Sequence, residues 1–316
     1  MRLPRPASLL RLLGCVCALA AAVSPAAAAD KKLVLIAGKP SHPPGAHEHR
    51  AGMLLLQKCL AGHPGLRVVV HDGGWPSKLV DGQRVDDHAA LADADAIVIY
   101  SDGGLKHPAL EGDRLAVLGR HVARGRGFGT LHYAVEPTKD KGQTEFLRWI
   151  GGAFETHWSV NPHWDAEFKA FPVHPVTRGV KPYTIRDEWY FNMRFRPGAP
   201  DGAGVTSLLG AVAPATTTSR PDGPHSGNPA VRALVAQAAR QTVAWAAENP
   251  DGSRGFGFTG GHYHANWKHD DQRRLVLNAL VWLAGLEVPA AGVASTVTDA
   301  DLAANLDDKP APRKKQ

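Results

Sequence analysis

Short apolar segments alternate with segments of helical periodicity along the first half of the chain. Apolar runs of this length are typical of buried strands, whereas apolar residues spaced three and four apart predict amphipathic helices. Strands are expected at residues 32–37, 68–70, 96–100 and 128–132, and helices at residues 47–60 and 113–122. Because apolar strands that alternate with helices pack best in a parallel sheet covered on both faces, the pattern predicts an α/β fold.

The second half of the chain is less regular. A Pro/Thr/Gly-rich stretch at 213–229 is expected to be a flexible loop. Val276, Leu280 and Leu283 share one helical face and predict a closing helix that stops at Gly285. Further elements are expected as a helix at 145–150 and strands at 166–171, 190–195, 205–212, 242–246 and 255–259.

Both ends of the chain differ in composition from the part between them. Three arginines precede an apolar run at 12–23, and alanines at 27–29 offer a cleavage site. This arrangement is typical of a secretory signal peptide and is too short for a stable membrane anchor. We therefore expect a secreted or periplasmic protein. The expected division is a signal peptide at 1–29, one α/β domain at 30–289 and a disordered tail at 290–316.

The net charge of +6 does not indicate nucleic-acid binding. Three leader arginines and four basic residues near the C-terminus supply seven positive charges, without which the net charge is −1. A nucleic-acid-binding surface needs basic residues gathered on a folded face, so nucleic acid is not an expected partner. Only Cys59 lies beyond the leader, and no internal disulfide is expected.

Histidines and carboxylates gather where the expected strands end. His132 closes the fourth strand within the sequence G-F-G-T-L-H-Y-A-V-E, and Glu136 ends the turn that follows. Both are candidates for a site, because ligands of open parallel sheets bind at the carboxyl ends of the strands. The loop after the first strand adds four more candidates, which are His42, His47, Glu48 and His49.

Two other regions carry the same residue types. The loop before the closing helix supplies His262, His264 and Trp267. The central region supplies His157, Asp187, Glu188 and Tyr190. Aromatic rings mixed with polar side chains are typical of a sugar site, because flat rings pack on C–H surfaces while polar groups bind hydroxyls. The structural alternatives are solvated loop histidines and a carboxylate pair with one exposed and one structural member.

Taken together, these motifs resemble the trehalose-utilisation (ThuA-like) family of the class I glutamine amidotransferase-like superfamily. The similarity rests on the His-rich loop after the first strand and on G-T-L-H-Y-A, H-P-V-T-R-G-V, D-E-W-Y and G-F-G-F-T-G-G-H, in that order along the chain. The resemblance implies a flavodoxin-like parallel sheet with helices on both faces. It also implies a role in sugar or glycoside metabolism.

The chain departs from the amidotransferases at the strand-to-helix elbow. Those enzymes carry a nucleophilic cysteine there, whereas this chain carries His132, and Cys59 lies in an expected helix. A Cys-dependent glutamine amidotransferase is therefore excluded. No G-x-G-x-x-G motif follows the first strand, so no nicotinamide cofactor is expected.

The resulting hypothesis is acid–base chemistry on a sugar or keto-glycoside, in a lyase, isomerase or hydrolase. Histidine suits this role because it titrates near neutrality. The catalytic candidates are His132, His262, Asp187 and Glu188, and the substrate-binding candidates are His42, His47, Glu48, His49, Glu136, His157, Tyr190, His264 and Trp267. The same histidines could hold a divalent metal such as Zn²⁺. The alternative is a non-catalytic carbohydrate-binding or partner protein that retains the fold.

Overall fold

The computed structural model describes Met1 and residues 29–310, so the expected signal peptide lies almost wholly outside the described residues. No helix in the described part of the chain has the length and apolar character needed to cross a lipid bilayer.

A seven-stranded sheet forms the centre of the domain, in the order β11-β12-β13-β6-β5-β1-β2. The five strands from β13 to β2 are parallel, while β12 runs antiparallel to both of its neighbours. The predicted α/β fold with a flavodoxin-like, mostly parallel sheet is confirmed, and the antiparallel edge is an addition to it. The strands are β1 (Lys31–Ala37), β2 (Leu66–His71), β5 (Ala96–Tyr100), β6 (Gly127–Leu131), β11 (Val205–Val212), β12 (Arg240–Glu248) and β13 (Arg254–Phe258).

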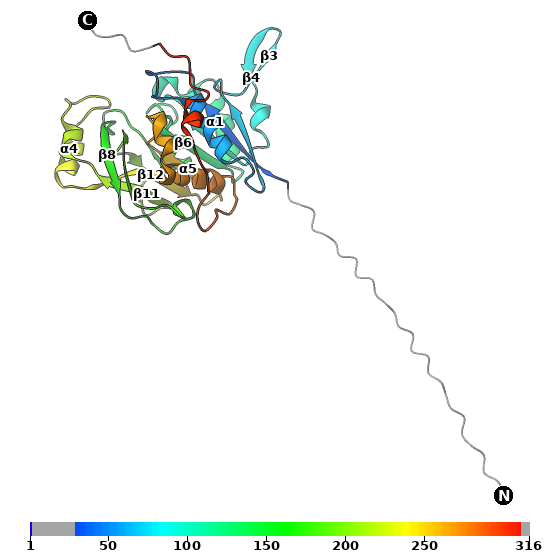
Figure 1. Ribbon diagram of the computed structural model, residues 1–316. Coiled ribbons are helices and arrows are strands. Elements are labelled where there is room, and N and C mark those ends of the chain that lie inside the picture. The colour runs from blue at the N-terminus through cyan, green and yellow to red at the C-terminus, as the bar shows by residue number, and fades with distance from the viewer. Residues whose placement is uncertain (2–28, 311–316) are drawn as a thin grey trace.

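Helices cover both faces of the sheet, because its central strands are apolar on both sides (Figure 1). Along β1, Leu33 and Leu35 face one apolar core with α1 and α5. The intervening residues Val34 and Ile36 face a second core with α2 and α3. The helices are α1 (His49–Cys59), α2 (Arg114–Val122), α3 (Gln143–Trp149), α4 (Pro229–Ala236), α5 (Asp270–Leu283) and α6 (Asp299–Ala303).

Three two-stranded ribbons lie outside the main sheet. They pair β3 (Ser77–Val80) with β4 (Gln83–Asp86), β7 (Gly152–Ala153) with β10 (Arg194–Phe195), and β8 (His163–Phe168) with β9 (Tyr183–Glu188). The β3–β4 hairpin projects from the body in Figure 1, whereas β8 packs beside β11.

The strand expected at 190–195 is a misreading of an apolar run. The neighbouring strand β9 ends at Glu188, and only the last two residues of the expected range form β10. Trp189, Tyr190 and Phe191 are all buried, so this run packs in the core without the alternation of a strand.

The C-terminal segment differs from the disordered tail expected at 290–316. Residues 290–310 return to the domain and form α6, which Thr298 caps. Lys309 then makes an ion pair with Glu48 at 3.1 Å, with both side chains at most 2% exposed. Polar composition suggested a solvated end, but the partner of this lysine lies far away in the sequence, where composition gives no sign of it.

Candidate functional site

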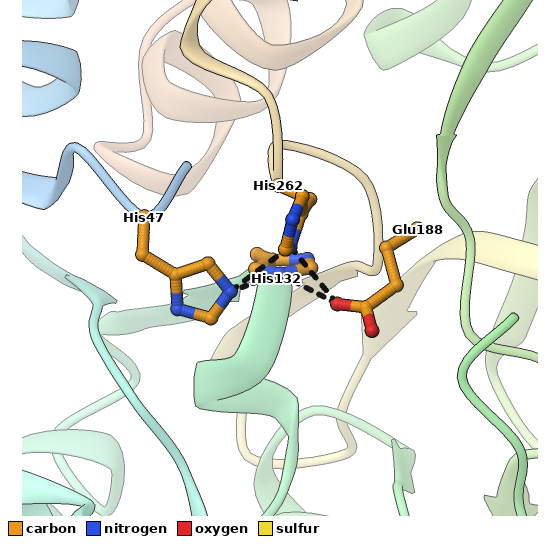
Figure 2. A group of neighbouring side chains, drawn as sticks. All are labelled: His47, His132, Glu188 and His262. Atoms are coloured by element: carbon orange, nitrogen blue, oxygen red, sulfur yellow. Dashed lines mark hydrogen bonds and ion pairs between the residues drawn. The ribbon is translucent and has the colours of Figure 1, made fainter. Parts of the chain in front are cut away.

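Four side chains from four separate segments converge above the carboxyl ends of the central strands (Figure 2). His47 precedes α1, His132 follows β6, Glu188 ends β9 and His262 follows β13. One nitrogen or oxygen of each lies within 4.8 Å of those of the others. We call these four residues the histidine cluster.

The distances within the histidine cluster are short. His47 Nε2 lies 3.0 Å from His132 Nε2 and 3.1 Å from His262 Nδ1. Glu188 Oε2 lies 3.0 Å from His262 Nδ1 and 3.5 Å from His132 Nε2. Three imidazoles and a carboxylate therefore direct one atom each toward a common point.

Local backbone geometry brings the ligand atoms to this point. His132 and His47 have φ angles of 55° and 49°, in the left-handed region that non-glycine residues rarely adopt. Such conformations persist where surrounding structure imposes them, and they cluster at functional sites. Gly127, in the strand that leads to His132, allows α5 to pack closely on β6. A Cβ at this position would lie 2.3 Å from the carbonyl oxygen of Leu283 and would prevent that approach.

The outer nitrogens of two rings have partners that fix their protonation. His132 Nδ1 lies 2.9 Å from the carbonyl oxygen of Thr259, which can only accept a hydrogen bond. His47 Nδ1 lies 2.9 Å from the carboxylate of Asp102. If both rings are neutral, Nδ1 carries the proton in each, and the two Nε2 atoms, 3.0 Å apart, are the atoms left to bind a ligand.

This donor set fits a first-row divalent metal ion. Tetrahedral Zn²⁺ with bonds of about 2.0–2.1 Å places neighbouring ligand atoms about 3.3 Å apart. Four of the six pairs of atoms here lie 3.0–3.5 Å apart, and all lie within 4.8 Å. Histidines whose second nitrogen bonds a carboxylate or a carbonyl are typical of metal ligands.

Electrostatics in the site keep the ligands in their binding forms. Burial, reinforced by the neighbouring His132, holds the pKa of His47 well below its usual range, so this ring stays neutral. Burial alone would raise the pKa of Glu188, but hydrogen bonds with His132 and His262 outweigh it and lower the pKa. Neutral imidazole and ionised carboxylate are the forms that bind metal.

Asp187 holds the loop that carries His262. Its buried carboxylate accepts hydrogen bonds from the backbone N–H groups of Gly261 at 2.7 Å and His262 at 3.0 Å, and from Asn266 Nδ2 at 3.0 Å. Its contacts give this residue, predicted to be catalytic, a supporting position behind the histidine cluster.

Other predicted site residues divide into those near the cluster and those away from it. Tyr190 OH lies 3.3 Å from both His132 Nε2 and Glu188 Oε2. His42 stacks on His47 with ring centroids 3.5 Å apart, and its side chain is 39% exposed. Glu136 bonds a histidine beside the cluster, His225.

Five predicted residues serve other contacts. Glu48 pairs with Lys309, as described above. His49 is buried against the carbonyl oxygen of Lys39, with its ring centroid 5.4 Å from that of His47, and His264 bonds the carbonyl oxygen of Leu302. Trp267 belongs to the apolar core, and the exposed His157 lies in the loop that contacts Pro224.

Sequence reasoning missed several neighbours of the cluster. Asp102, which follows β5, was not among the expected site residues, and His225 lies in the loop expected to be flexible. His163 Nε2 lies 3.7 Å from Glu188 Oε1, and Asn161 Nδ2 donates to the same oxygen at 3.1 Å. The aromatic and histidine content of residues 155–164 was the available signal for the last two.

A cavity of about 860 Å³ lies beside the histidine cluster. The loops after β1, β2 and β5 line it, so it occupies the point where the strand order reverses, as ligand sites of open α/β sheets do. Ser41 and Asp102 line the cavity and are hydrogen-bonded to each other, whereas none of the four cluster residues lines it. Asp102 therefore connects the two, because it lines the cavity and its carboxylate also bonds His47 of the cluster.

Comparison with known proteins agrees with this architecture. The model of the ThuA family, described as trehalose utilisation, matches residues 45–283. The chain belongs to the ThuA family. A crystal structure of a protein described as ThuA-like from Bacteroides uniformis ATCC 8492 has a TM-score of 0.55 at 14% identity, covering 83% of this chain and 95% of that chain. At this identity the ThuA-like structure supports the fold alone.

No curated protein matches the chain. The family description connects the chain with carbohydrate use.

Proposed function

We propose that this ThuA-family protein is exported and acts on a sugar or keto-glycoside by histidine–carboxylate acid–base chemistry, assisted by a divalent metal such as Zn²⁺. The observation that carries the proposal is the convergence of three imidazoles and the Glu188 carboxylate on one point. This set of ligand atoms suits a divalent metal ion, and the family description points to a carbohydrate ligand.

The residues of the site would divide the work as follows. His47, His132, His262 and Glu188 would hold the metal ion. When bound, such an ion polarises a hydroxyl or carbonyl oxygen as a Lewis acid. His42 and His163 each have a side chain that is 39% exposed and contact the ring of His262, so they would flank a sugar that reaches the cluster.

The chemistry would begin with removal of a proton next to a carbonyl group and lead to elimination or isomerisation; hydrolysis is the third possible outcome. A base with a pKa near neutrality suits this step, and histidine supplies it without extensive tuning. Neither a cysteine nucleophile nor a nicotinamide is required.

A non-catalytic carbohydrate-binding or partner protein is the second candidate function. The observation that favours it is the number of protein ligands, because a site closed by four protein ligands is typical of structural zinc. In that case the metal ion would stabilise a sugar-binding fold and no turnover would occur.

Incubation with glycosides and 3-keto-glycosides separates the two functions. The catalytic proposal expects turnover that chelation abolishes and added Zn²⁺ restores, and that His132→Ala lacks. Tight binding of sugar without turnover, in protein whose metal content has been verified, would favour the non-catalytic candidate. Export is tested separately by sequencing the N-terminus of protein from the periplasm or the medium, where mature protein is expected to begin at Asp30.

A further inference from the structure

A second pair of histidine and carboxylate lies beside the histidine cluster. His225 Nε2 donates to both carboxylate oxygens of Glu136, at 3.0 and 3.1 Å. The Glu136 side chain is 3% exposed and that of His225 is 32% exposed, so a buried carboxylate holds an imidazole that is partly accessible to solvent. We call this pair the Glu136–His225 dyad.

Asn161 connects the dyad to the histidine cluster. Its backbone N–H donates to the carbonyl oxygen of His225 at 3.0 Å, and its side-chain amide donates to Glu188 Oε1 at 3.1 Å. Arg220 strengthens the link, because its guanidinium donates to Asn161 Oδ1 at 2.9 Å and to the carbonyl oxygen of His225 at 3.1 Å. The loop that carries His225 is therefore tied to the residue that positions a cluster carboxylate.

Aromatic packing sets the orientation of the His225 ring. It stacks on Phe154 with centroids 5.1 Å apart and an interplanar angle of 23°. Tyr133 meets the ring edge-on at 6.4 Å, and the same tyrosine ring meets His47 at 6.1 Å and Tyr190 at 6.3 Å. Tyr133 is thus a shared neighbour of the dyad and the cluster.

Two of the three cluster imidazoles, those of His132 and His47, have both ring nitrogens engaged and are poorly placed to carry protons, whereas His262, within the part of the chain that the structure describes, engages Nδ1 alone. His132 uses Nδ1 for Thr259 and Nε2 for the cluster, and His47 uses Nδ1 for Asp102 and Nε2 for the cluster. Within residues 29–310, Nδ1 of His225 makes no hydrogen bond. A general base needs such a free nitrogen, together with a partner that fixes its tautomer.

We propose that His225, oriented by Glu136, is the proton-transfer residue for the reaction at the histidine cluster; this inference rests on the proposed function. The substrate is a glycoside with a carbonyl group next to the carbon that loses its proton. The C–H bond breaks, its electron pair enters the enolate, and the proton binds Nδ1 of His225. The enolate pair then expels the glycosidic oxygen, which takes the proton back. No oxidant or reductant is consumed.

The groups around the ring favour this role near neutral pH. The hydrogen bond with Glu136 raises the pKa of His225, against the opposing effect of burial. Glu188 acts in the same direction as Glu136, and Arg220 opposes both. Burial raises the pKa of Tyr133, so this phenol stays neutral beside the ring.

The test compares wild type, His225→Asn and His88→Asn on a 3-keto-glycoside, with bound metal measured in each. His88 is a matched control because it too pairs with a carboxylate, with Nε2 3.0 Å from Asp113, and its side chain is also 32% exposed. It differs in position, since it lies in the turn at His88–Leu91 and not beside the histidine cluster. We expect kcat to fall about 10²–10⁴-fold in His225→Asn with metal content unchanged, and to be unaffected in His88→Asn. Added imidazole is expected to restore part of the activity of His225→Ala.

Glu136→Gln gives a second readout that a merely structural role would not move. Because an amide cannot raise the pKa of His225 as a carboxylate does, the acid limb of kcat/KM is expected to shift to lower pH. Normal turnover by His225→Asn, or an unchanged acid limb in Glu136→Gln, overturns the role of the dyad and leaves the proposed function intact. Absence of turnover by wild type overturns the proposed function, and the dyad's role with it.

Discussion

The histidine cluster and the Glu136–His225 dyad both place a buried glutamate against imidazole, with opposite effects on the carboxyl group. Hydrogen bonds with His132 and His262 lower the pKa of Glu188 despite its burial. Burial raises the pKa of Glu136, and its single histidine only partly compensates. A carboxylate among several imidazoles is held as an anion, as a metal ligand must be. A carboxylate with one imidazole is suited to orienting that ring and stabilising its proton.

Glu48 provides a third case, in which the partner of the buried carboxylate is a permanent cation. Lys309 makes an ion pair with it, and Asp307 N–H donates to its other oxygen at 3.0 Å. Lys309 Nζ also donates to the carbonyl oxygens of Ala46 at 2.6 Å and His47 at 3.1 Å. Three buried glutamates thus differ in what compensates them, and each predicts a different response to substitution.

The largest expected effect is a loss of stability when the cation of Lys309 is removed. Lys309→Met leaves the charge of Glu48 buried and uncompensated, which costs about 3–5 kcal/mol of unfolding free energy. Urea unfolding measures this loss. The double variant Lys309→Met/Glu48→Gln is expected to recover most of it, because the uncompensated charge is gone. A loss below about 1 kcal/mol, the usual value of an exposed ion pair, would show that the C-terminal segment does not stay docked in solution.

The second largest expected effect is on Zn²⁺ affinity, and it distinguishes Glu188 from Glu136. Glu188→Gln is expected to weaken Zn²⁺ binding by at least about 100-fold, since even partners of metal ligands are worth 10–100-fold. Competition with a chromophoric chelator measures the dissociation constant. Glu136→Gln is the matched control and should leave Zn²⁺ affinity unchanged. Equal losses in the two variants would contradict the division between a metal-binding and a proton-handling region.

The smallest effect is the pH dependence of stability that the dyad contributes. The pKa of His225 is raised in the folded state, so its contribution is fully present below the unfolded value of about 6.5 and is lost as pH rises through the folded pKa. Each unit of difference between the two pKa values is worth about 1.4 kcal/mol. The unfolding free energies of wild type and His225→Asn can be measured from about pH 5 to about pH 9, a range that includes the titration of histidine. The two free energies should therefore converge at alkaline pH. A difference in unfolding free energy that stays constant with pH would contradict a raised pKa of His225 in the folded protein.

The strands could be predicted from sequence where burial on both faces leaves an uninterrupted apolar run. The range expected at 96–100, which is apolar and buried throughout, coincides with β5. The expectation failed for β9, whose side chains alternate between buried and exposed beside β8, and for the β3–β4 hairpin, whose residues are largely exposed. These elements depend on a neighbouring strand more than on their own apolar content.

The position of the candidate site was also accessible from sequence, because parallel strands present their carboxyl ends at one edge. His132 and His262 follow directly from that rule. The assignments within the site were not accessible. Asp187 and Glu188 are adjacent in sequence, yet one holds a loop and the other joins the cluster, because successive side chains of a strand point to opposite sides. His225 lay hidden in a loop whose composition suggested flexibility.

By itself the sequence determined an α/β sheet with histidines at its strand ends, since burial patterns and chain turns are local properties. Only the tertiary structure decided that His47, His132 and His262 meet, with Glu188 among them, and that Lys309 returns to Glu48. The physical reason is distance along the chain. Contacts between residues so far apart depend on how whole strands and helices pack, and the local sequence around each residue does not encode that packing.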